Sequence, residues 1–119
     1  MILTVTLNPA VDKSYYIPEL IPDEVIRVDK ITQTAGGKGI NVAKIAKLLG
    51  NDVVATGFLG GNSGKYVQEF LENAGICSCF IKSRAATRTC VNVNDVKNKQ
   101  QTVLLEPGSF VSHYLQEKF

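Results

Sequence analysis

A glycine-rich run with a lysine, Thr34-Ala-Gly-Gly-Lys-Gly-Ile-Asn-Val-Ala-Lys44, is the stretch whose residue types are best suited to bind an anion. Gly36, Gly37 and Gly39 allow the backbone to adopt positive φ angles and to approach a ligand closely. The helix expected after them would direct its free N–H groups and the positive end of its dipole to the same point, and Lys38 adds a full charge. This pattern predicts a site for a phosphorylated metabolite. A plain glycine turn between a strand and a helix is the alternative.

The chain does not match two common glycine-rich nucleotide motifs. A dinucleotide fingerprint that begins at Gly37 would need its third glycine at Val42. A Walker A loop ending at Gly64-Lys65 would need a glycine at Leu59 and a serine or threonine at Tyr66. Neither NAD nor a P-loop nucleotide is therefore expected as a ligand.

Three segments, in this order along the chain, resemble one enzyme family: Thr4-Val-Thr-Leu-Asn-Pro-Ala-Val-Asp12, Gly36-Gly-Lys-Gly-Ile-Asn-Val-Ala43 and Thr87-Arg-Thr-Cys-Val-Asn92. They are similar to the ribokinase-like (phosphofructokinase B, PfkB) carbohydrate kinases, and within these to the branch of 1-phosphofructokinase and tagatose-6-phosphate kinase. The resemblance implies a partial ribokinase-like fold in which residues 1–119 form the N-terminal, sugar-phosphate-binding part. It also implies an ATP-dependent kinase that uses Mg²⁺ and acts on a ketohexose monophosphate such as fructose 1-phosphate or tagatose 6-phosphate.

The resemblance also indicates which chemistry this chain lacks. In the family the catalytic base is an aspartate in a Gly-Ala-Gly-Asp sequence, at the N-terminus of a helix that forms the anion hole. None of the five aspartates here follows a Gly-x-Gly: Asp12, Asp23, Asp29, Asp52 and Asp95. We therefore expect no catalytic residue, no metal site and no good binding of ATP or Mg²⁺ in this chain, and no activity for the chain alone. A non-enzymatic sugar-phosphate-binding or dimerising module, or a gene fragment, is the alternative.

The candidate substrate ligands come from the three segments. The resemblance implies a substrate-binding aspartate at Asp12, whose carboxylate would accept hydrogen bonds from two sugar hydroxyls; a turn-forming aspartate is the alternative. Lys38 and the amides of Gly37 and Gly39 would face the sugar or its phosphate. Asn41, in the first helical turn, offers a donor and an acceptor to a sugar hydroxyl, although an asparagine there is also a common local cap.

Arg88 completes the set, because the resemblance implies that the arginine at this position contacts the substrate phosphate. Its planar guanidinium suits a phosphate dianion. Without the resemblance, a lone arginine at the start of a strand is more often a solvated residue. Cys90 lies beside it but has no histidine nearby in the sequence, so we assign it no catalytic role.

Composition places the chain among single globular domains, with 119 residues of which 45% are hydrophobic. A net charge of +2 is too small for a nucleic-acid-binding surface. The three cysteines lack paired spacing and there is one histidine, so a zinc site or disulfide framework is not expected; we predict reduced, half-buried thiols. Residues 1–7 have no basic leader and are followed by Asn8-Pro9, so we expect neither a signal peptide nor a membrane span, and a cytoplasmic protein.

Alternating patterns predict an α/β chain. Strands are expected at 1–7, 53–59, 79–82, 89–94 and 102–105, and helices at 40–49, from Asn62 or Ser63 to 73, and after Ser112. Strands at 13–17 and 25–34 lack the continuous apolar run of a central parallel strand, so they should form a peripheral sheet. The resemblance implies that this sheet, at about 12–34 and 88–95, is a lid over the sugar and a homodimer interface.

Overall fold

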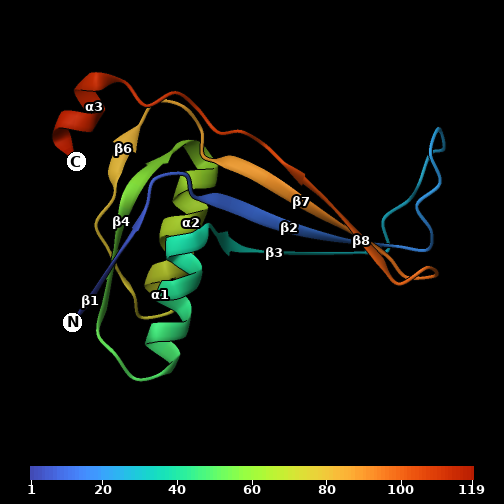
Figure 1. Cartoon of the computed structure of the whole chain (residues 1–119), viewed down its shortest axis with the longest axis horizontal. Coiled ribbons are helices and arrows are strands. Elements are labelled where there is room, and N and C mark those ends of the chain that lie inside the picture. Colours follow the sequence, from blue (N-terminus) through green and yellow to red (C-terminus); the bar gives the residue numbers. More distant parts are fainter.

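The computed structural model describes all 119 residues, which form a helix-covered base and a projecting arm of strands (Figure 1). The chain measures 45 × 35 × 18 Å along its principal axes, because the arm extends away from the base. In chain order the elements are β1 (Ile2–Thr6), β2 (Ala10–Ile17), β3 (Lys30–Gly36), α1 (Lys38–Leu48), β4 (Val53–Gly60), α2 (Gly61–Asn73), β5 (Cys77–Ser78), β6 (Ile81–Ser83), β7 (Arg88–Asp95), β8 (Gln100–Leu105) and α3 (His113–Lys118).

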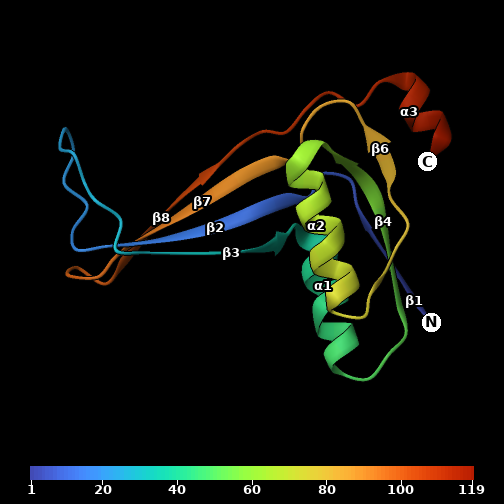
Figure 2. The same cartoon turned by 180° about the vertical axis from the view of Figure 1, so that it is seen from behind.

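The base is a small parallel sheet with α1 and α2 on one face (Figures 1 and 2). The central strand β4 pairs with β1 along one edge and with β5 and β6 along the other. Ile40, Val67 and Leu71 are fully buried between the helices and the sheets, and each such burial contributes about 1.5–3 kcal/mol. The complete core cluster is Val11, Ala35, Ile40, Ala43, Ala46, Val53, Ala55, Leu59, Val67, Leu71 and Ile76.

The other face of this sheet is largely uncovered. Leu3, Val5 and Leu7 project from it and are 59%, 45% and 58% exposed. The C-terminal helix α3 covers only a part, where the rings of Phe58 and Phe119 lie 5.5 Å apart. A row of apolar side chains along β1 therefore remains in contact with solvent.

The arm is a second sheet, which we call the lid sheet, with strand order β3-β2-β7-β8 (Figure 2). Its two central strands, β2 and β7, are parallel, whereas the outer pairs are antiparallel. Val11 and Ala35 anchor it, because they belong to the same core cluster as the helices. Every residue of the edge strand β8 is exposed. The predicted peripheral sheet is thus confirmed.

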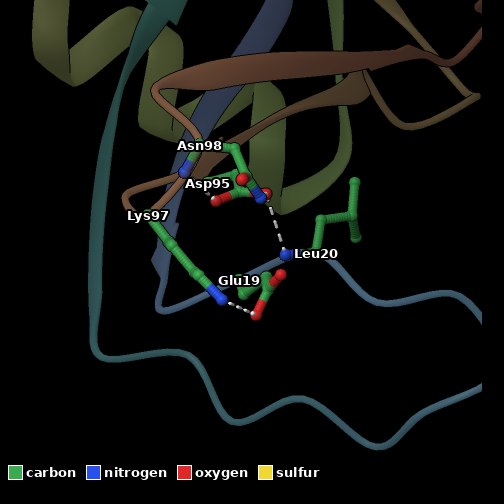
Figure 3. A network of polar contacts seen from close by, with 5 residues as sticks. All are labelled: Glu19, Leu20, Asp95, Lys97 and Asn98. Carbon is green, nitrogen blue, oxygen red and sulfur yellow. Dashed lines mark hydrogen bonds and ion pairs between the residues drawn. The ribbon is translucent and has the colours of Figure 1, made fainter.

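A hydrogen-bonded aspartate closes the far end of the lid sheet (Figure 3). Asp95 accepts from the amide and the side-chain nitrogen of Asn98, at 2.9 and 2.8 Å, and from the amide of Leu20 at 3.1 Å. Hydrogen bonds from Asn98 hold the pKa of the Asp95 carboxyl below its usual range, and the Leu20 amide and Lys97 act in the same direction. This aspartate ties the β7–β8 turn to the loop after β2.

Most predicted elements are confirmed with small shifts of their ends, but three predictions are wrong. The strand expected at 25–34 begins only at Lys30 and continues to Gly36, since Val25 is 91% exposed and outside the strand pairing. The strand expected at 79–82 is two short pieces, because the chain pairs with β4 at two separate places. The helix α2 begins after Gly60 without a side-chain cap, and the Ser63 hydroxyl instead donates to the Thr87 carbonyl at 2.6 Å.

The cysteines also differ from the prediction of half-buried thiols. Cys90 is buried, because it lies on the central strand β7, whereas Cys77 and Cys79 are exposed at the edge of the parallel sheet. All three are free. None of the helices combines the length and the apolar content needed to cross a membrane.

Candidate functional site

The candidate site is built around the turn Asn8–Pro9, which leaves the carboxyl end of β1 and enters the lid sheet. In open α/β sheets, ligands bind outside the carboxyl ends of the strands. The Arg88 guanidinium donates from Nη2 to the Asn8 carbonyl at 3.0 Å. Gly37 packs on the other side of the turn, where a Cβ atom would lie 3.3 Å from the Cα of Pro9. Segments far apart in the sequence therefore meet at this turn.

Asp12 lies directly over Gly36, the residue that ends β3. A Cβ atom on Gly36 would overlap Oδ2 and Cγ of Asp12 and would lie 2.8 Å from Oδ1. The pairing of β2 with β3 explains this contact, because Ala10 is opposite Gly36 and Asp12 follows on the same face. The carboxylate is only half-buried, so its oxygens remain available to a ligand next to the glycine run.

The N-terminus of α1 follows Gly37 and has no side-chain cap. Gly37 has φ of 116°, a value that favours glycine, so the predicted positive φ is confirmed at this residue. The helix has no acidic residue in its first turn, and Lys38 is exposed without an ion pair. Free amides, the helix dipole and one positive charge thus occur together, as an anion site requires.

Gly39 has a packing role that the sequence did not reveal. A Cβ atom there would overlap Oγ1 of Thr6 and the Val5 carbonyl, and it would lie 2.8 Å from the Val5 carbonyl carbon. The first turn of α1 therefore rests against the backbone of β1, which only a glycine permits. A side chain on Gly39 would point toward the strand, so Gly39 would contribute to ligand binding through its amide alone.

Arg88 is held in place by the protein's own carbonyl groups. Besides the bond to Asn8, Nη1 donates to the Glu106 carbonyl at 3.0 Å. Nε is buried and has no partner. The Glu106 side chain accepts from the amide of Thr89 at 3.0 Å, so the chain after β8 is bound to the start of β7. Arg88 is thus half-buried and hydrogen-bonded within the chain, while its phosphate contact stays a prediction.

Lys44 is a neighbour of the site that sequence reasoning missed. Its Nζ atom donates to Oγ1 of Thr34 at 3.0 Å and to Oδ1 of Asn41 at 3.4 Å, and it lies 5.2 Å from the ring centre of Phe70. Partial burial lowers the pKa of the Lys44 ammonium, and the nearby Asp12 carboxylate opposes that shift. Lys44 follows Asn41 by three residues in a helix, a spacing at which two side chains are neighbours, so the sequence did contain a signal for this contact.

The predicted ligands do not share one cavity. Asp12 lines a hollow of about 330 Å³ on the lid sheet, together with Lys13, Ser14, Thr34, Cys90, Val91, Asn92, Val103 and Leu105. Arg88 borders a narrow space of about 30 Å³ beside Asn8. Asn41 borders a separate, apolar hollow with Val42 and Ile45. Gly37 and Arg88 therefore lie against Asn8–Pro9 and Asp12 lies over Gly36, whereas Asn41 is joined to Gly37 by its amide, at 2.9 Å, and to Lys44 by its side chain.

No group of three or more His, Cys, Asp or Glu side chains is placed to hold a metal ion.

Comparison with known proteins places these features in a family. The chain is 43% identical over all its 119 residues to the tagatose-6-phosphate kinase of Staphylococcus epidermidis, and it spans 38% of that protein's length. A structure from Thermotoga maritima, described as a possible 1-phosphofructokinase, superposes with a TM-score of 0.89 at 36% identity, over 99% of this chain and 38% of that one. Phosphofructokinase-2 from Escherichia coli, solved in complex with fructose-6-phosphate, gives 0.91 at 26% identity, over 98% and 40%.

The family model for pfkB family carbohydrate kinases matches residues 2–118. The match includes the glycine run, the Asn8–Pro9 turn and the lid sheet, so the predicted resemblance and the α/β, ribokinase-like fold are both confirmed. The chain spans about two fifths of the relatives to which it aligns. It belongs to the pfkB family of carbohydrate kinases.

Proposed function

We propose that this chain is the sugar-phosphate-binding part of a kinase of the tagatose-6-phosphate kinase or 1-phosphofructokinase type, which phosphorylates a ketohexose monophosphate. One observation carries the proposal. The Asp12 carboxylate, an acceptor suited to sugar hydroxyls, lies on Gly36, immediately before the uncapped N-terminus of α1. A hydroxyl acceptor and an anion site therefore adjoin, as a phosphorylated sugar requires. The names of the Staphylococcus epidermidis and Thermotoga maritima relatives support the substrate class.

Each candidate residue has a distinct role in this proposal. Asp12 accepts hydrogen bonds from the sugar hydroxyls. The amides of Gly37 and Gly39, with the charge of Lys38, attract the anionic end of the substrate. Arg88 keeps unused N–H donors after its bonds to Asn8 and Glu106, and these serve the phosphate.

Asn41 contributes a sugar-hydroxyl contact from the first turn of α1. Its Oδ1 atom already accepts from Lys44, so the amide nitrogen is the group that remains to donate. Lys44 thereby orients Asn41 and adds positive charge beside the Asp12 carboxylate.

The chemical step is not assigned to residues of this chain. In the complete enzyme ATP supplies the phosphoryl group and Mg²⁺ offsets its charge. The chain has no Gly-x-Gly-Asp segment and no cluster suited to hold a metal. We therefore propose that the isolated chain binds without transferring phosphate. A coupled assay of ADP release with tagatose 6-phosphate should show no turnover; turnover that Asp12→Ala abolishes would contradict this.

The lid sheet is proposed to cover the sugar and to provide the contact in a homodimer. Its edge strand β8 is exposed throughout, and Val103, Leu104 and Leu105 on it are more than half exposed. An unpaired edge with apolar side chains favours pairing with another strand. Light scattering at graded concentrations should reveal a dimer that Leu104→Lys weakens.

Calorimetric titration tests the proposed binding roles. Tagatose 6-phosphate and fructose 1-phosphate should bind the wild-type chain, and Asp12→Asn should weaken these ligands and the unphosphorylated sugars alike. Arg88→Ala and Lys38→Met should weaken only the phosphorylated ligands. A charge-assisted contact contributes about 1.5–3 kcal/mol, so each loss should be about tenfold to a hundredfold.

Lys38→Met is the cleaner of the two phosphate tests. Lys38 makes no hydrogen bond or ion pair within the chain, whereas Arg88 also supports the turn at Asn8 and the segment at Glu106. The matched control is Lys65→Met, which removes another exposed lysine near the start of α2 and should change nothing. Unchanged binding of tagatose 6-phosphate to both Lys38→Met and Arg88→Ala would show that the phosphate assignment is wrong.

A further inference from the structure

The face of the lid sheet that carries Asp12 has a second polar row that no role described above uses. The strand register places Asp12 opposite Cys90 and Ser14 opposite Asn92. Side chains two residues apart share a face of a strand, so all four project to the same side. The second row lies about 7 Å farther along the strands than Asp12.

Both rows line the hollow of about 330 Å³ that begins at Asp12 and Thr34. Its walls are mainly polar at the strands β2 and β7, and Val103 and Leu105 of β8 close one side. A hollow that contains a carboxylate, a hydroxyl and an amide is suited to a polyol, because a sugar presents hydroxyls that both donate and accept.

Asn92 is the residue in this hollow whose bonding is incomplete. Its Oδ1 atom is buried and has no hydrogen-bond partner in the folded chain. Buried polar atoms are normally paired, and an unpaired one reduces stability. The next asparagine on the same face, Asn94, differs in this respect, because its side-chain nitrogen donates to the Tyr15 carbonyl at 3.2 Å.

We infer that Asn92 is a substrate-binding residue, whose Oδ1 atom accepts a hydrogen bond from a hydroxyl of the sugar at the end remote from the phosphate. The inference rests on the proposed function, since it requires that Asp12 and the α1 N-terminus hold a sugar phosphate. Along β7 the side chains of Arg88, Cys90 and Asn92 follow one another on this face at intervals of about 7 Å. The phosphate thus lies near Arg88, the middle hydroxyls near Asp12, which is opposite Cys90, and the distal hydroxyl near Asn92. Asn92 therefore selects for sugars that extend to the second row.

The test compares Asn92→Leu with Asn94→Leu, two nearly isosteric changes on one face of one strand. Titration with tagatose 6-phosphate should show binding to Asn92→Leu weakened by about threefold to tenfold, the range for a neutral hydrogen bond. Binding of inorganic phosphate should be unchanged, because it reports the anion site alone. The melting temperature of Asn92→Leu should not fall, since the change removes an unpaired buried oxygen. Asn94→Leu should show the opposite pattern, with a lower melting temperature and unchanged binding.

Each remaining outcome is decisive. Equal affinity of the wild-type chain and Asn92→Leu for tagatose 6-phosphate, while Asp12→Asn still weakens it, overturns the assignment of Asn92 and leaves the proposed function intact. A parallel loss of inorganic phosphate binding shows a general distortion and also overturns the assignment. If tagatose 6-phosphate does not bind the wild-type chain, the proposed function and this inference both fail.

Discussion

Replacing Gly36 by alanine would test the placement of Asp12 more directly than replacing Asp12 itself. The added methyl group would occupy the position of the Asp12 carboxylate, since it would overlap Oδ2 and Cγ. To restore van der Waals separation, the carboxylate must move by roughly 1 Å or more. The backbone is not the obstacle, because Gly36 lies in a regular strand and does not have a positive φ. The substitution therefore displaces one functional group and keeps its charge.

The expected result is a large loss of binding with a small loss of stability. A displacement of about 1 Å from the productive geometry is enough to cost on the order of a hundredfold in function. Loss of charge-assisted hydrogen bonds of about 1.5–3 kcal/mol predicts a decrease of affinity for tagatose 6-phosphate of about tenfold to a hundredfold. Overpacking costs about 1–3 kcal/mol in a rigid core, and the low end applies here because the half-exposed carboxylate is free to rotate away.

A double-mutant cycle isolates the cause. In an Asp12→Ala background the clash no longer exists, so adding Gly36→Ala should change neither the affinity nor the melting temperature further. Isothermal titration and thermal unfolding of the four proteins supply both readouts. The reasoning is refuted if Gly36→Ala binds tagatose 6-phosphate like the wild type. It is also refuted if the two substitutions reduce affinity additively, because Gly36 would then act independently of Asp12.

Two further predictions concern stability and association. Asp95→Asn should lower the melting temperature at pH 7, because a carboxyl whose folded pKa is lowered stabilises the fold while it is ionised. The difference in melting temperature from the wild type should therefore shrink as the pH falls below about 4. Asp29→Asn, at an exposed aspartate, is the control, and a pH-independent difference would contradict the assignment. With Leu104→Lys present, so that the proposed lid-sheet dimer is already weakened, Leu3→Ser should further reduce self-association seen by light scattering, because Leu3 belongs to the uncovered face of the parallel sheet. Val96→Ser in the same background, at a residue equally exposed on the lid tip (60% against 59%), should not. Equal effects of these two serine variants would show that the sheet face is not the associating surface.

Periodicity predicted the elements of the base but only one of the two buried helix faces. Val67 and Leu71 have helical spacing and are fully buried in α2, and 53–59 is the central strand. In α1 the apolar spacing of Val42, Ile45 and Leu49 was misleading, because these side chains are 58%, 58% and 76% exposed and the helix buries Ile40, Ala43 and Ala46 instead. The lid sheet was harder to delimit, because both of its faces are open over much of its length. The segment from Val25 has the composition of a strand yet lies outside the pairing, and only the partner strand β2, which ends at Ile17, decides where β3 begins.

The site was predictable as far as it depends on chain neighbours. The glycine run and the helix that follows it are contiguous, so their geometry could be inferred. Lys44, Asn8 and Glu106 join the site through contacts between distant segments, or through a side chain that turns back along its helix. The opposition of Ser14 and Asn92 likewise depends on a parallel pairing between β2 and β7, which are separated in the sequence by β3, α1, β4, α2, β5 and β6. No local pattern encodes such a register.

The glycines of the run show why residue type alone is an ambiguous signal. Gly37 needs its positive φ, Gly39 needs the space of a hydrogen atom against β1, and Gly36 leaves room for Asp12. Each requirement is met within the folded chain, so none of them by itself demonstrates a ligand. The three requirements nevertheless have one joint effect, which is to bring the N-terminus of α1 against the carboxyl end of β1 with a carboxylate beside it. A turn that merely joined β3 to α1 would need only the first of them, and the close approach of the other two is what favours a binding site.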